Sequence, residues 1–259
     1  MDSSRRKFFT SLTALTSASF LSAGQTLESS EGLQESQAGL HYPDLSGTYL
    51  DNASHHPMTL TAATAVSDYV SGLTRGHSTN VSASVRAKFA QLINAGEDEI
   101  SYGPSTTMGE NLITAALDIP ARGGQIITDA LHFIGSFYLY EQLEKRGMEV
   151  VILPVQEDGS ISIDQYQAAV TDETILIAVS HISWVNGFEH DLKSLSDIAH
   201  AAGAYLYVDL IQSAGNTPID VKAMGIDFAS CGTYKWLMGD FGLAFLYADK
   251  LLLDDLDPP

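Results

Sequence analysis

The chain has 259 residues, of which 45% are apolar and 17% charged, so it can bury a large core and is not collagen-like, disordered or a coiled coil. Lys and Arg number 13 against 32 Asp and Glu, a net charge of −19, which excludes a general attraction for nucleic acid or anionic membranes. The single cysteine, Cys231, excludes an intramolecular disulfide and a thiolate metal cluster, and we predict no metal site.

The amino terminus has the layout of an export signal. Residues 4–9 read Ser-Arg-Arg-Lys-Phe-Phe, and residues 10–23 are uncharged and rich in apolar and small side chains. The paired arginines resemble the twin-arginine signal, whose machinery moves folded proteins, whereas an ordinary secretory signal or a basic amphipathic end are the alternatives. We predict a signal over 1–23, a linker and amino-terminal arm over 24–46, a periplasmic location, and no membrane association once the signal is removed.

From residue 47 onward, short β-rich runs alternate with amphipathic helical segments. Strands are predicted at residues 48–51, 99–102, 125–128, 150–153, 175–179, 205–209, 228–230 and 243–247. Helices between them include 81–95, 108–117, 137–146 and 192–202. This alternation indicates an α/β domain over 47–259 with a mainly parallel, helix-covered sheet. A Gly-x-Gly-x-x-Gly turn does not follow the first predicted strand, which argues against a nicotinamide or flavin dehydrogenase.

One lysine stands out by its surroundings. Lys235 lies in the aromatic and apolar segment 233–239, directly after a predicted strand, where burial would lower its pKa and free the amine as a nucleophile. The alternative is a lysine whose stem covers Trp236 while its charge stays in water. The other lysines beyond residue 23, Lys222 in a polar turn among them, have ordinary solvated settings.

Two further features lie where strands end or helices begin, the places where such sheets bind ligands. Asp209 ends the apolar run 205–209, and a buried carboxylate there needs a cation or several donors, unless it simply caps a helix or forms a turn. Residues 105–107 read Ser-Thr-Thr at a predicted helix start, which suits an anion, although a capping box from Thr107 to Glu110 needs no ligand. A lysine amine, a strand-end acid and an anion site are together what pyridoxal phosphate requires.

Five ordered segments carry a family resemblance: residues 49–53, 105–112, 179–187, 207–215 and 233–237. They resemble the class V aminotransferase family, which groups cysteine desulfurases, kynureninases, isopenicillin N epimerase-like enzymes and several transaminases. The resemblance covers the chain from about Gly47 to its end. It implies the large domain of a pyridoxal-phosphate-dependent transferase of fold type I, a small-molecule amino-acid substrate and a homodimer.

The resemblance also implies roles for individual residues. Lys235 matches the family's Schiff-base lysine, Asp209 the carboxylate that pairs with the pyridine nitrogen, and Gln212 a residue near the ring hydroxyl. The positions matching phosphate contacts are Thr106, Thr107 and, just before the lysine, Thr233 or Tyr234.

The substrate side departs from the desulfurase pattern. Phe133 falls at the ring-stacking position, as in kynureninases, and His132, one place away, is the second choice there, its alternative being a satisfied surface or supporting histidine. Trp184 stands where desulfurases have Asn. Cys231 precedes the lysine and is not at the position of the desulfurase nucleophile, so we expect a buried strand residue.

The resemblance implies an enzyme that acts on an amino acid by transamination or Cβ-bond lyase chemistry, with epimerisation also open. Family members continue into a smaller domain that carries the substrate-carboxylate arginine, and we expect this domain to be missing from the chain. None of Arg75, Arg86, Arg122 and Arg146 follows a predicted strand end. The alternative is therefore a non-catalytic, truncated or decayed copy that keeps the cofactor-binding fold.

We predict that residues 1–30, fused to a reporter that is active only when exported folded, direct export that is lost when Arg5 and Arg6 both become Lys. The reason is that the paired arginines precede an uncharged segment of modest hydrophobicity. Reporter activity in the periplasmic fraction measures this. Undiminished export of the double variant would indicate the general secretory route instead.

Overall fold

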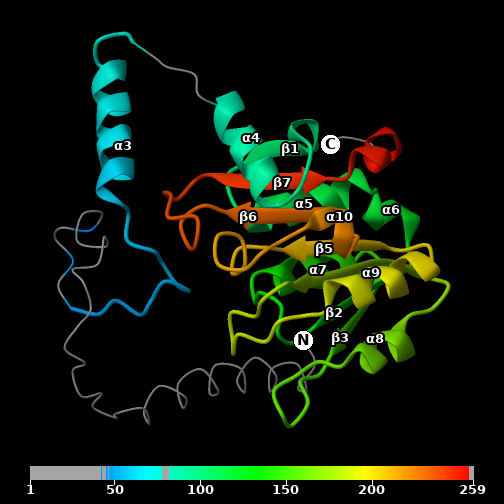
Figure 1. Ribbon diagram of the computed structural model, residues 1–259. Helices are drawn as coiled ribbons and strands as arrows, with labels where there is room; N and C mark the ends of the chain where they lie inside the picture. Colours follow the sequence, from blue (N-terminus) through cyan, green and yellow to red (C-terminus); the bar gives the residue numbers. More distant parts are fainter. Residues whose placement is uncertain (1–41, 43–44, 46, 78–81, 257–259) are drawn as a thin grey trace. The chain divides into compact units, whose positions relative to one another are not determined.

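The computed structural model describes residues 42, 45, 47–77 and 82–256 of the chain (Figure 1). The predicted export signal and nearly all of the predicted linker therefore lie outside the described residues. Among the described residues, no helix is both long and apolar enough to span a membrane.

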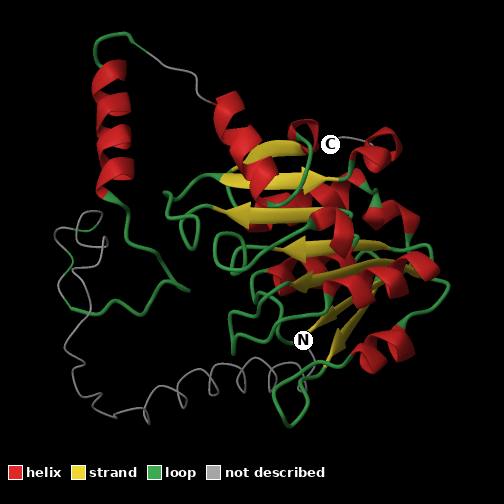
Figure 2. Cartoon of the chain, in the orientation of Figure 1, coloured by secondary structure: helices red, strands yellow, loops and turns green. Residues whose placement is uncertain are grey.

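A seven-stranded mixed sheet forms the centre of the described chain (Figure 2). Its strands are β1 (Ile100–Gly103), β2 (Gln125–Asp129), β3 (Glu149–Leu153), β4 (Thr174–Ser180), β5 (Tyr205–Asp209), β6 (Phe228–Gly232) and β7 (Ala244–Ala248). They lie in the order β1-β7-β6-β5-β4-β2-β3, and β7 runs antiparallel to both of its neighbours while the other pairs are parallel. The predicted α/β class with a mainly parallel sheet is confirmed.

Helices connect the strands and cover the sheet. They are α3 (Leu60–Leu73), α4 (Ser82–Leu92), α5 (Thr106–Ala116), α6 (Ile119–Arg122), α7 (Ser136–Glu144), α8 (Ile163–Ala169), α9 (Leu192–Ala201) and α10 (Val221–Met224), with 3-10 turns η1 (Glu97–Glu99) and η2 (Lys250–Asp255). Helix α7 connects β2 to β3 at the edge of the sheet. Helices α8, α9 and α10 connect β3 to β4, β4 to β5 and β5 to β6, and so run in the opposite direction along the sheet. Because such crossovers are right-handed, α7 covers one face of the sheet and the later three helices cover the other.

The alternation of side chains along the strands divides the buried residues between the two faces. In β5, Leu206 and Val208 point into the apolar cluster formed with Leu195 and Ala199 of α9. Tyr207 and Asp209 lie on the opposite face, which α5 covers. In β6, Cys231 is fully buried in the apolar cluster, as expected for a strand residue. The carboxyl ends of β2, β4, β5 and β6 consequently share one edge of the sheet.

The strand predicted at 48–51 is wrong. This segment is irregular, Leu50 is 87% exposed, and no strand pairs with the segment within the described part of the chain. The chain turns immediately afterwards, since the carbonyl of Asp51 accepts hydrogen bonds from the backbone N–H groups of Ser54 (3.1 Å) and His55 (3.0 Å).

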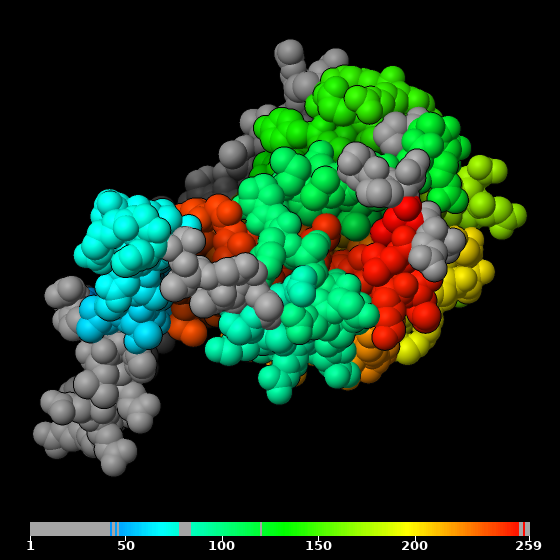
Figure 3. All heavy atoms as spheres, turned by 90° about the horizontal axis from the view of Figure 1, so that it is seen from above, coloured from blue at the N-terminus to red at the C-terminus, as the bar shows by residue number. Residues whose placement is uncertain are grey.

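The solvated setting expected for Lys222 is confirmed, since its side chain is 38% exposed, but its ammonium group forms ion pairs that the sequence does not indicate. Its ammonium group donates hydrogen bonds to Glu99 (2.5 Å), Asp249 (3.0 Å) and the Tyr247 hydroxyl (3.1 Å). Glu99, a buried carboxylate, also accepts a hydrogen bond from the backbone N–H of Lys250 (3.0 Å). These contacts join α10, η1, β7 and η2, and Figure 3 shows η2, in red, beside the teal residues before α5.

Candidate active site

Three polar side chains stand in register at the shared carboxyl edge of the sheet. Asp209, the last residue of β5, pairs with Ser180 of β4 on one side and with Ser230 of β6 on the other. Because partners in register point to the same face, all three lie under α5 rather than in the apolar cluster. Asp209 is 4% exposed.

Asp209 is a buried carboxylate with little compensation. One oxygen accepts a hydrogen bond from the backbone N–H of Ile211 (2.8 Å). Burial raises the pKa of Asp209 to about 6, although the charges of His132 and Lys235 and the Ile211 N–H act in the opposite direction. Such a group is poised to bind a cation.

Lys235 supplies a buried amine after the next strand. It is 8% exposed, and its Nζ lies 5.9 Å from the centre of the Tyr234 ring and has no hydrogen-bond partner among the described residues. Burial lowers the pKa of Lys235, while the charge of Asp209 opposes this shift. A larger share of the amine is therefore neutral and nucleophilic near neutral pH than for an exposed lysine.

The loop around Lys235 is tied down from several sides. The indole N–H of Trp236 donates to the side-chain oxygen of Gln212 (2.9 Å), and the Gln212 amide in turn donates to the carbonyl of Ala53 (2.8 Å). Gly215 has φ +93°, and a Cβ there would lie 2.5 Å from the Trp236 carbonyl oxygen, so only glycine fits. The amide of Gln212, matched to the ring hydroxyl by sequence, thus also anchors the Lys235 loop.

The two residues before Lys235 differ in their freedom to bind an anion. The Thr233 hydroxyl donates to the carbonyl of Asp240 (2.6 Å), which occupies its one proton within the loop. The Tyr234 ring is half-buried, stacks on Phe241 at 4.3 Å between ring centres, and its backbone carbonyl accepts from the N–H of His56 (3.0 Å).

The amino terminus of α5 is fixed against the end of β6. The Thr106 hydroxyl accepts a hydrogen bond from the backbone N–H of Gly232 (2.9 Å), and Ser230 Oγ donates to the Thr106 carbonyl (2.9 Å). Gly109 permits this approach, since a Cβ there would lie 2.6 Å from Ser230 Cβ. Thr107, next along α5, is half-buried. Thr106 and Thr107 therefore open a helix whose positive end lies beside the Lys235 strand.

The capping box expected from Thr107 to Glu110 is wrong. The cap is Ser105, whose hydroxyl accepts from the N–H of Met108 (3.1 Å). Glu110 is instead 2% exposed and accepts hydrogen bonds from Ser136 Oγ (2.5 Å) and from the Tyr140 hydroxyl of α7. Sequence reasoning missed this role. The signal was helical spacing, because Glu110 shares the buried side of α5 with Thr106 and Ile113.

His132 and Phe133, the two candidates for the stacking position, have different surroundings. His132 is fully buried, with Nδ1 2.9 Å from Ser180 Oγ and Nε2 3.4 Å from Glu110, so a surface role is excluded. Phe133 is half-buried and meets the Trp184 ring edge-on at 6.1 Å between centres. The Trp184 indole N–H donates to the His132 carbonyl (3.2 Å), which fixes the aromatic pair to this loop.

Another buried acid was missed at the end of β2. Asp129 accepts hydrogen bonds from the backbone N–H of Leu131 (2.7 Å) and from the Tyr166 hydroxyl, and lies 3.1 Å from His190 Nε2. Burial alone would raise the pKa of Asp129, but these partners lower it below its ordinary value. Asp129 ends an apolar strand as Asp209 does, so the same sequence rule could have found it.

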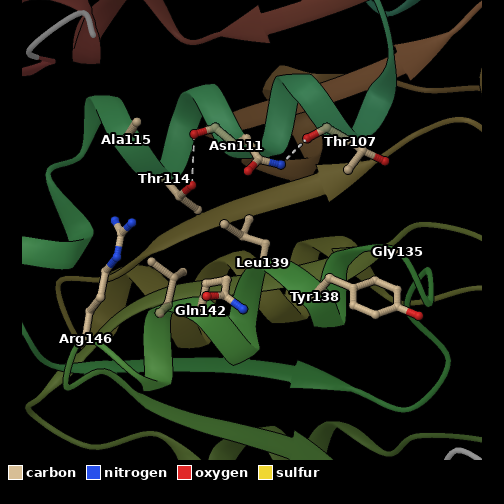
Figure 4. A pocket seen from close by; sticks show the side chains of 10 residues that line it. Thr107, Asn111, Thr114, Ala115, Gly135, Tyr138, Leu139, Gln142 and Arg146 are labelled. Carbon is tan, nitrogen blue, oxygen red and sulfur yellow. Dashed lines mark hydrogen bonds between the residues drawn. The ribbon is translucent and has the colours of Figure 1, made fainter.

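A surface pocket of about 440 Å³ lies between α5 and α7 (Figure 4). Thr107 stands at one end and Arg146 at the other, with Tyr138 and Gln142 along the wall. Neither Asp209 nor Lys235 lines this pocket. The candidate active site is therefore at the strand ends, and the pocket touches it only through Thr107.

The described arginines lie elsewhere. Arg86 pairs with Glu97 (3.1 Å), Arg122 ends α6 just before β2, and Arg146 precedes β3. These positions are near the amino ends of strands, opposite the edge that carries Lys235. Arg75 lies in the turn after α3.

Comparisons with known proteins point to one family. The family model described as aminotransferase class-V matches residues 49–259. The uncharacterized aminotransferase YcbU of Bacillus subtilis is 35% identical over 174 residues, which are 67% of this chain and 46% of the relative. A cysteine desulfurase of Haloferax volcanii is 30% identical over 250 residues, 90% of this chain and 58% of the relative.

The fold has a counterpart among solved structures. The cysteine desulfurase CsdA of Escherichia coli superimposes with a TM-score of 0.75 at 25% identity, covering 86% of this chain and 59% of CsdA. The chain thus spans about half the length of the relatives that it matches.

We predict that Asp209→Asn stabilises the cofactor-free protein at pH 8. The folded-state pKa of Asp209 is about 6 against an ordinary 3.8, so the ionised group destabilises the fold as pH rises through this range. A shift of this size corresponds to at most about 3 kcal/mol, and we expect a gain of about 1–3 kcal/mol at pH 8 and little change at pH 4. Urea unfolding at both pH values measures it.

Asp129→Asn is the matched control, because its buried carboxylate has a lowered pKa and contributes stability above its ordinary pKa. This variant should lose stability at pH 8. If Asp209→Asn also lost stability at pH 8, this would contradict the conclusion that the buried, ionised Asp209 destabilises the fold.

Proposed function

Because the chain belongs to the aminotransferase class-V family, we propose that it is a pyridoxal-phosphate-dependent enzyme that acts on an amino acid. The observation that carries the proposal is the buried pair at the strand ends: Asp209, whose burial is only partly offset, and Lys235, whose amine has no hydrogen-bond partner among the described residues. Relatives named as an aminotransferase and as cysteine desulfurases support the same class.

The residues present suit this cofactor. A pyridinium nitrogen needs a buried anion, which Asp209 offers, and an aldehyde carbon needs an amine of lowered pKa, which Lys235 offers. A phosphate needs backbone N–H groups at a helix start, which the anchored terminus of α5 at Thr106 and Thr107 offers. When bound, pyridoxal phosphate supplies an electron sink for the bonds at the substrate's Cα.

Asp209 would keep the ring nitrogen of the cofactor protonated. Its carboxylate stands on the rigid end of β5, hydrogen-bonded to Ile211 and flanked by Ser180 and Ser230. A positive ring nitrogen partner lowers the cost of burying the carboxylate, and the carboxylate in turn favours the protonated nitrogen. Loss of this charge should slow the reaction more than it weakens binding.

Lys235 would hold the cofactor through its amine, and the same amine would move a proton at the substrate's Cα. Its lowered pKa leaves a share of neutral amine that can accept this proton near neutral pH. The bonds of Trp236 to Gln212 and of Met238 N–H to the Lys235 carbonyl (2.9 Å) limit the loop's motion and so orient the amine.

The reaction after proton removal is transamination or lyase chemistry at Cβ, as the names of the relatives suggest. Cys231 does not serve as a sulfur acceptor in this proposal. Its thiol is buried on the apolar face of β6, away from the face of Asp209, and burial raises its pKa well above the ordinary value. Trp184 would lie on the substrate side, with its ring edge-on to Phe133 at the ring-stacking position.

A second candidate is a protein that binds the cofactor without turnover. It is favoured by the positions of Arg86, Arg122 and Arg146, which lie away from the Lys235 edge and so provide no bidentate clamp for a substrate carboxylate there. Assaying keto acid, sulfide and alanine release with a panel of amino acids separates the two candidates.

We predict that pyridoxal phosphate, added to the purified protein and fixed with borohydride, labels Lys235, and that Lys235→Ala abolishes the label. The buried amine at the end of β6 has the lowered pKa that the reaction needs. Peptide mass mapping identifies the labelled lysine. Lys193→Ala removes an exposed lysine that pairs with Asp197, and should leave the label intact. Labelling at any other lysine contradicts the assignment.

A further inference from the structure

Glu110 is a buried charge for which the proposed function has no use. Its carboxylate is 2% exposed on the inner side of α5 and is an acceptor only. Ser136 and Tyr140, both on α7, each donate their single hydroxyl proton to it. Two hydroxyl donors do not neutralise a buried carboxylate, so a cation is needed.

His132 is the group that can supply this cation. Its Nε2 lies 3.4 Å from Glu110 Oε1, and its Nδ1 lies 2.9 Å from Ser180 Oγ. Both ring nitrogens thus have an acceptor within reach, which suits the doubly protonated imidazolium. Ser180 is the register partner of Asp209, so the bonds lead from α5 through His132 to the strand end that carries Asp209.

We propose that Glu110 is a positioning residue that holds His132 as a cation beside Asp209, and thereby keeps Asp209 ionised for the ring nitrogen of the cofactor. The role in cofactor binding rests on the proposed function. The charge state of His132 does not, because it depends only on residues of this chain.

The carboxylates around His132 are negatively charged and therefore favour its protonated, cationic form. The ionisable groups that act on it or on Glu110 come from α5, α7 and the two strands β2 and β5: Glu110, Tyr140, Asp129, Tyr207 and Asp209. Burial alone would lower the pKa of His132, but the charge and hydrogen bond of Glu110, followed by the charges of Asp209 and Asp129, raise it above 6.5. Burial would likewise raise the pKa of Glu110, and His132 and the two hydroxyls lower it.

The effect on Asp209 follows from the opposing contributions. His132 lowers the pKa of Asp209 more than Glu110 raises it. Replacing Glu110 with a neutral residue removes its negative charge and lowers the pKa of His132, so His132 is protonated a smaller fraction of the time. The lost attraction to the His132 charge outweighs the lost repulsion from Glu110. The pKa of Asp209 therefore rises, and a greater fraction of Asp209 is protonated near neutral pH.

The test is an NMR titration of the histidines in the cofactor-free protein, with His132 assigned by its absence in His132→Gln. The chain has 8 histidines, so the signals can be separated. In the wild type His132 should titrate above 6.5, and Glu110→Gln should lower its midpoint by at least one unit, a tenfold change in proton affinity. Glu141→Gln, which removes a surface partner of Lys145 on α7, should leave it unchanged.

A second variant covers the case in which Glu110→Gln fails to fold. Tyr140→Phe removes a donor from Glu110 and makes the carboxylate more basic, so the His132 midpoint should hold or rise. A wild-type midpoint at or below 6.5, an unchanged midpoint in Glu110→Gln, or a fall in Tyr140→Phe would overturn the proposal.

Cofactor affinity gives the second readout. Glu110→Gln should bind pyridoxal phosphate about tenfold more weakly than wild type at pH 7, with Glu141→Gln unaffected. Wild-type protein that fails to bind the cofactor while His132 titrates as expected would refute the proposed function but not the charge on His132. Normal affinity in Glu110→Gln with a lowered His132 midpoint would refute the link to Asp209.

Discussion

The free-energy cost of burying Asp209 organises the candidate site. The carboxylate stands at the end of β5 with one backbone donor, and its pKa of about 6 reflects burial that its neighbours only partly offset. His132 and Lys235 supply positive charge near it and Ser180 and Ser230 supply hydroxyls, whereas the negative charge of Glu110 acts against its ionisation. A cationic ligand would complete this arrangement, and the site is less stable without one.

The register of the parallel strands and the close approach of α5 to β6 position these groups. Parallel strands β4, β5 and β6 place their last residues in register, and α5 reaches β6 closely because Gly109 leaves room for Ser230. The same approach puts Glu110 under the sheet, where α7 supplies its donors. One helix thus brings both an anion-binding terminus and a buried negative charge to the strand ends.

Most of the sheet could be predicted from the sequence, because strands such as β5 are apolar runs, and the burial of Asp209 and Lys235 could be expected because one ends such a run and the other lies in an apolar and aromatic segment. Tertiary partners could not be predicted in the same way. The sequence predicts a solvated Lys222, but its ammonium group donates a hydrogen bond to Glu99 from a distant segment. The sequence also predicts that Glu110 takes part in a helix cap, but Glu110 is buried against α7. The segment 48–51 has strand-like residues and no strand to pair with, which local propensity does not reveal.

The central claim is that Asp209 keeps the ring nitrogen of bound pyridoxal phosphate protonated. Nitrogen-15 NMR of the protein loaded with cofactor labelled at that nitrogen tests it most directly, with Asp209→Asn as the comparison. The account predicts the chemical shift of a protonated nitrogen in the wild type at pH 8 and of a neutral nitrogen in the variant. A neutral nitrogen in the wild type, or a protonated one in both proteins, would contradict it.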